Sequence, residues 1–156
     1  MTPAQLLILS QDISTKPEFF SLPNNSDAGT TIADWYNTTA TPAFIVWRTS
    51  VAPVEIMSNG FRWSDIDVMT AGKYRIWQLM AGLEAINPSK ANVRQGLNDA
   101  FTAGTPMMLA IAPHLRRSAT RVEKLFATGT GTDASPATMV LEDALTYADV
   151  ITARNL

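Results

Sequence analysis

Apolar side chains recur at helical spacing through the middle of the chain. Spacings of three, four and seven residues separate the members of this stripe, which are Ile66, Met69, Ile76, Trp77, Met80 and Leu83. The pattern predicts a core helix that begins at Ser64, with Asp67 completing a capping box, and restarts at Thr70, where Ala71-Gly72 weakens it.

Helix-start signals divide the rest of the chain into short helices. Thr or Asn before Pro, or Thr three residues before Glu or Asp, marks the starts at Thr2-Pro3, Asn87-Pro88, Thr105-Pro106, Thr120 and Thr146. Further short helices are expected over 29–36 and 53–59, and residues 15–28 are expected to form a loop. The β-branched and aromatic run 43–47 has no neighbour that would make a hairpin, so it predicts either a lone extended segment or a buried helical turn.

These elements predict a mainly α fold: a compact helical bundle with an irregular N-terminal region and an extended C-terminal arm. Residues 1–128 are expected to form the helical core domain with an N-terminal arm, and 129–136, rich in Gly and Thr, a flexible connector. Residues 137–156 are then an extended arm ending in a short helix. Such an apolar tail either folds back on its own core or docks on a neighbouring subunit.

Composition limits the class of function more than it identifies one. The 156 residues carry 12 Lys and Arg against 14 Asp and Glu, a formal net charge of -2, and only 17% of them are charged. A mildly acidic chain lacks the global positive field of a non-specific nucleic-acid binder. Its low charge content favours a surface that other proteins cover. The longest apolar runs, 42–47 and 107–113, are far shorter than the roughly 20 residues of a membrane span, so no membrane association is expected.

Catalytic, metal and cofactor chemistry finds little support in the sequence. The chain has no Cys and one His, His114, which removes thiolate sites and leaves no second imidazole for a metal. His114 stands beside Arg116 and Arg117 and no Gly-x-Ser-x-Gly motif accompanies it. The Gly129-Thr-Gly131 stretch lacks the Lys of a phosphate-binding loop. We therefore expect a protein that is not an enzyme and holds no cofactor.

Two groups of residues are candidates for contacts with other molecules. Arg117, Arg121 and Lys124 share one helix face if the helix runs through 118–120; the face is then a solvated surface, a subunit salt bridge or a DNA-phosphate contact. Large rings near loops often anchor interfaces. The remaining predicted interface residues are Trp35, Trp47, Trp63, Met139, Val140 and Leu141.

Four blocks of sequence resemble small structural-module proteins of tailed bacteriophages and prophages. The blocks are Ile-Ala-Asp-Trp-Tyr-Asn at 32–37, the stretch 42–51, Ile-Asn-Pro-Ser at 86–89, and 118–139 with its Ala-Thr-Arg-x-Glu-Lys-Leu and Gly-Thr-Gly motifs. The likeness extends over about 29–149, with 118–139 as its specific part. It implies a virion component, and it carries no catalytic residues over to this chain.

Within that resemblance, the chain looks like a head-to-tail connector, an adaptor whose copies form a ring below the portal. The expected partners are other copies of itself, the portal protein, other neck or tail proteins and the packaged DNA. Its expected location is the virion, assembled in the bacterial cytoplasm. The alternatives are a capsid decoration or tail-completion protein, or an accessory protein that binds DNA or host factors.

Overall fold

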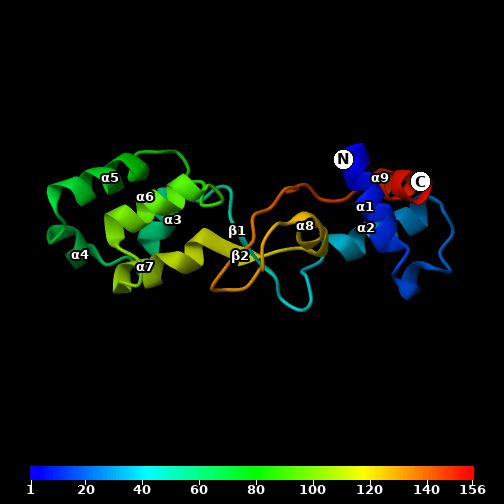
Figure 1. The fold of residues 1–156 in the computed structure, drawn as a ribbon, viewed down its shortest axis with the longest axis horizontal. Helices are drawn as coiled ribbons and strands as arrows, with labels where there is room; N and C mark the ends of the chain where they lie inside the picture. The colour runs from blue at the N-terminus through cyan, green and yellow to red at the C-terminus, as the bar shows by residue number, and fades with distance from the viewer. The chain divides into compact units, whose positions relative to one another are not determined.

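The computed structural model describes all 156 residues, and they form two compact units (Figure 1). The terminal unit contains both ends of the chain, Met1–Phe44 and Ser118–Leu156, and the central unit is Ile45–Arg117. The fold is mainly α, as predicted, with nine α-helices and one two-stranded sheet. None of the helices combines the length and the apolar character needed to cross a membrane.

The terminal unit is built from segments that lie far apart in the sequence. Its helical elements are α1 (Pro3–Ile13), the short 3-10 helix η1 (Pro17–Phe19), α2 (Ser26–Asn37), α8 (Arg121–Phe126) and α9 (Tyr147–Arg154). Their buried side chains form one hydrophobic core, which includes Leu9, Ile32, Tyr36, Val122 and Val150. Thr120 and Thr146 make the capping boxes expected from the sequence, and Thr2, expected as a cap before Pro3, makes one with Gln5.

The predicted C-terminal arm folds back onto this core. Helix α9 packs against α1 and α2, and Gly29 of α2 permits the close approach, since a Cβ there would lie 3.1 Å from the Tyr147 carbonyl oxygen. The Asn37 side chain exchanges two hydrogen bonds with the Leu145 backbone, at 2.8 and 2.9 Å. Of the two outcomes considered for the apolar tail, this chain adopts the first. Buried apolar area offsets the entropy of ordering its end.

The Gly/Thr-rich stretch 129–136 is a hydrogen-bonded loop, whereas composition predicted a flexible connector. Thr128 and Thr138 exchange backbone hydrogen bonds of 2.8 and 2.9 Å, and Thr132 and Ser135 exchange a second pair. Gly129 and Gly131 both have positive φ, which explains their identity. The boundaries expected at 128 and 137 therefore lie inside the terminal unit.

The central unit has a helical core of its own. Its elements are β1 (Ile45–Trp47), α3 (Pro53–Ser58), α4 (Trp63–Asp67), α5 (Ala71–Ala81), α6 (Ala91–Phe101), α7 (Pro106–Ile111) and the 3-10 helix η2 (Ala112–Leu115). The restart at Thr70 is confirmed, because the Thr70 hydroxyl caps α5. The capping box at Ser64 was wrong: α4 begins at Trp63, and Asp65 instead pairs with Arg62.

Strand β1 finds its partner about 70 residues further along the chain. It pairs with β2 (Arg116–Ser118), so residues 45–47 are extended but not isolated. Two consecutive arginines in a three-residue strand give no hydrophobic alternation. The hydrophobic pattern therefore predicted neither β2 nor its pairing with β1.

Candidate functional site

The structure distributes the predicted interface residues over both units and over different environments. Trp35, Trp47 and Leu141 are partly buried, and Met139 lies in the buried core, so it is not an exposed contact. Trp63 and Val140 are exposed, at 62% and 61%. Of the three tail residues, Val140 is thus the one that is mostly exposed to solvent.

The predicted basic helix face is only partly formed. Arg117 lies in β2 and α8 begins at Arg121, so no helix runs through 118–120. The Thr120 capping box fixes the start of α8, and the residue before a capped helix start is not helical. Arg121 and Lys124 remain together on α8, where both line a pocket of the terminal unit.

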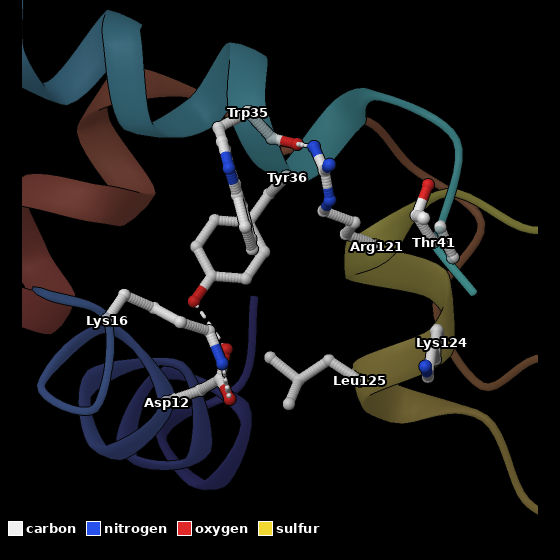
Figure 2. Close-up of a pocket in the computed structure, with 9 residues that line it drawn as sticks. Asp12, Lys16, Trp35, Tyr36, Thr41, Arg121, Lys124 and Leu125 are labelled. Atoms are coloured by element: carbon white, nitrogen blue, oxygen red, sulfur yellow. Dashed lines mark hydrogen bonds and ion pairs between the residues drawn. The ribbon is translucent and has the colours of Figure 1, made fainter. Parts of the chain in front are cut away.

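We call this feature the stacked-arginine pocket (Figure 2). Its volume is about 250 Å³, and α1, α2, α8 and the segments that follow the first two supply its walls. The lining residues are Asp12, Lys16, Trp35, Tyr36, Ala40, Thr41, Arg121, Lys124 and Leu125.

Arg121 is held in place by its surroundings. Its guanidinium carbon lies 4.1 Å from the centre of the Trp35 ring, a cation–π contact. It donates a hydrogen bond of 2.9 Å to the Trp35 carbonyl oxygen and another to the Thr38 hydroxyl. Five donor hydrogens are available on a guanidinium, so these bonds leave donors for a further acceptor.

Lys124 supplies a second positive charge that no carboxylate neutralises. Its ammonium nitrogen lies 5.7 Å from the centre of the Phe44 ring, and it forms no ion pair. An ammonium over an aromatic ring remains free to donate hydrogen bonds on its other sides. Lys124 is therefore available to an anion that enters the pocket.

The one carboxylate that lines the pocket, Asp12, already has partners inside the unit. Lys16 donates to Asp12 Oδ1 over 3.0 Å and the Tyr36 hydroxyl donates to Asp12 Oδ2 over 2.5 Å, so both converge on one carboxylate (Figure 2). Burial, with the hydrogen bond to Asp12 and the Asp12 charge behind it, raises the pKa of Tyr36 above its usual range. Tyr36 is therefore neutral at physiological pH, and the lining carries three cations against one carboxylate.

This positive pocket stands in an acidic unit. The terminal unit has four Lys and Arg against nine Asp and Glu, a formal net charge of -5. A surplus of +2 that is confined to one hollow of such a unit selects for an anionic group. A carboxylate or a phosphate has the charge and the acceptor geometry that a guanidinium and an ammonium recognise.

No protein-family model, no curated protein and no solved structure matches this chain. The assignment of function therefore depends on the residues themselves.

His114 belongs to a hydrogen-bond network inside the central unit. Its Nε2 atom is hydrogen-bonded to the Asn59 carbonyl oxygen at 3.1 Å, and its own carbonyl oxygen accepts from Arg48 at 3.2 Å. Arg48 also makes a bidentate ion pair with Glu55. The hydrogen bonds from Arg48 lower the pKa of the Glu55 carboxyl group. No cluster of three His, Cys, Asp or Glu side chains could hold a metal ion.

The central unit carries a second hollow, which is apolar. It has a volume of about 280 Å³ and lies between α5 and α6, which pack side by side (Figure 1). We call it the α5–α6 hollow; its apolar lining comes from Ile76, Leu79, Met80, Leu83, Ile86 and Val93. Leu79 is 69% exposed and Leu83 is also exposed, although the sequence placed Leu83 in the core stripe.

Sequence reasoning missed half of the charged groups in the stacked-arginine pocket. Asp12 and Lys16 are four residues apart near the end of α1, a spacing that predicts an ion pair on a helix surface. Their position beside α8 depends on the packing of the terminal unit. No local pattern connects residues 12–16 to residues 121–124.

Proposed function

We propose that this chain is a non-enzymatic structural subunit of a tailed-bacteriophage particle, a head-to-tail adaptor whose copies form a ring against the portal. The observation that carries the proposal is the stacked-arginine pocket. It holds a rigid guanidinium and an unpaired ammonium at the surface of an otherwise acidic unit. Such a pocket suits an acidic side chain of a neighbouring protein subunit.

Preorganisation is the physical reason why this arrangement favours docking. Trp35 and the two acceptors that hold Arg121 reduce the side-chain entropy that binding would otherwise cost. A bidentate contact between a guanidinium and a carboxylate also fixes orientation. An adaptor copy that docks on a portal subunit needs a contact of defined angle, so an oriented contact suits the proposed role.

An accessory protein that binds DNA is the second candidate, and the charge of the central unit favours it. This unit carries eight Lys and Arg against five Asp and Glu, a formal net charge of +3. A DNA complex made through phosphate contacts weakens steeply as salt rises. Retention on DNA that falls in this way would support the accessory role.

A capsid decoration protein would instead be present in hundreds of copies per particle.

We expect Lys124→Glu to reduce incorporation of the protein into phage particles by about tenfold, because a carboxylate now faces the incoming anion. Lys124 is a cleaner probe than Arg121, whose guanidinium also holds Trp35 and Thr38 of its own unit. Incorporation is measured by mass spectrometry of phage particles made in infected cells in which the variant is the only form of this protein.

Lys124→Met is the matched control, since it removes the charge but keeps the length of the side chain. Its incorporation should lie between that of the wild type and that of Lys124→Glu, and circular dichroism should show the same helix content in all three. Wild-type incorporation of the Lys124→Glu protein would remove the pocket from the proposal.

A further inference from the structure

The two units of this chain carry opposite net charges. The terminal unit has a formal charge of -5 and the central unit of +3, although the whole chain has only -2. Opposite charges on two parts of one molecule favour contact between the terminal unit of one copy and the central unit of another. They disfavour the pairing of like units, because like charges repel.

The α5–α6 hollow is an apolar depression on the positively charged central unit. Leu79 lies on the same face of α5 as Arg75, one turn earlier, and Leu83 follows the C-terminal end of this helix. Lys90 immediately precedes α6, on the other side of the hollow. Arg75 and Lys90 are exposed and make no ion pair, whereas Glu84 is the exposed carboxylate next to Leu83.

The acidic unit offers a segment with the complementary pattern. Val140 is 61% exposed and is followed closely by Glu142 and Asp143, which are both exposed. Residues 140–146 belong to no helix or strand, so this stretch of chain has a shape that can lie along a groove. An exposed aliphatic side chain followed by the exposed carboxylate of Asp143 matches an apolar hollow beside which Arg75 and Lys90 outweigh the single carboxylate of Glu84.

We propose that copies of this chain associate head to tail, with the segment 140–143 of one copy seated in the α5–α6 hollow of the next. Val140 enters the hollow beside Leu79, and Asp143 lies near the cations that flank it. The inference deepens the proposed function and rests on it, since both require contact between copies. It names the surfaces through which a ring would close.

The geometry of such a contact differs from that of a two-fold dimer. Segment and hollow are different surfaces, so an open chain of copies leaves one hollow and one segment unused at its two ends, and a closed ring uses all of them. Charge complementarity also makes the association weaker at high salt, because surface charges are screened.

The test uses two variants of the purified full chain that each block one side of the contact. Leu79→Asp places a carboxylate in the hollow against the acidic segment, and Val140→Lys places a cation against Arg75 and Lys90. Both positions are exposed, so neither change disturbs a core. Sedimentation velocity over a concentration series gives the size of the species formed by each protein and by an equimolar mixture.

We expect the wild type to form species larger than a dimer, and each variant to lower the association constant by about tenfold or more, consistent with loss of one buried aliphatic contact. The mixture should form a one-to-one dimer, because one variant keeps an intact segment and the other an intact hollow. Leu109→Asp is the matched control; this leucine of α7 is 67% exposed but does not line the hollow, and its substitution should leave association unchanged.

Three results would overturn the inference: a wild type that stays monomeric, variants that associate like the wild type, or a mixture that forms no dimer. These outcomes need no phage. A chain that associates as expected but is absent from particles would instead contradict only the proposed function.

Discussion

Trp77→Ala is expected to destabilise the central unit by about 3–5 kcal/mol, the usual cost of removing a large aromatic side chain from a packed core. Trp77 is 4% exposed, and its ring lies 5.4 Å from that of Phe61 and 5.0 Å from that of Phe101. The change leaves a cavity that two rings border, and rigid rings collapse poorly into such a space. Urea unfolding, followed by circular dichroism and by the indole N–H signal of Trp47, measures the loss.

Trp63→Ala is the matched control for this substitution. Trp63 also packs on Phe61, at 4.9 Å between ring centres, but it is exposed and lies at the start of α4. Its removal should cost about 1 kcal/mol, since little of its area is taken from water. Equal losses for both tryptophans would mean that Trp77 is not at the centre of this core.

Gly131→Ala is expected to destabilise the terminal unit by about 3 kcal/mol or more, from two separate causes. Gly131 has a φ of 65°, which any other residue adopts only with strain. It also lies against Phe44, so closely that an added Cβ would overlap the ring. The Phe44 ring must therefore move to admit the methyl group, which also disturbs the contact between this ring and Lys124.

Gly104→Ala separates these two causes. Gly104 has a similar φ of 78°, but no atom lies within 4 Å of the position that its Cβ would take. This substitution should cost only the backbone strain, about 1 kcal/mol. If Gly131→Ala costs no more than Gly104→Ala in urea unfolding, the loop does not pack on Phe44.

Short-range features of this fold were predictable because their physical causes are local. A threonine side chain that caps a helix contacts groups only three residues away, so Thr2, Thr105, Thr120 and Thr146 identify their helix starts correctly. The same holds for the restart at Thr70. The capping box predicted at Ser64 was wrong because a hydroxyl inside the first turn of a helix gives the same sequence pattern as one that caps the helix.

Long-range features were not predictable for the opposite reason. The terminal unit joins both ends of the chain, and its stacked-arginine pocket needs α1, α2 and α8 at once. Composition predicted a flexible connector at 129–136, because glycines that permit a tight packed loop look the same as glycines that permit disorder. The opposite net charges of the two units can be counted only when the residues that belong to each unit are known.

The stoichiometry of the protein in intact phage particles tests the central claim most directly. Quantitative mass spectrometry of purified virions, calibrated against the portal protein, gives the number of copies per particle. An adaptor ring predicts about as many copies as the portal has, because each copy contacts portal subunits around one closed ring. Absence of the chain from mature virions would contradict the account.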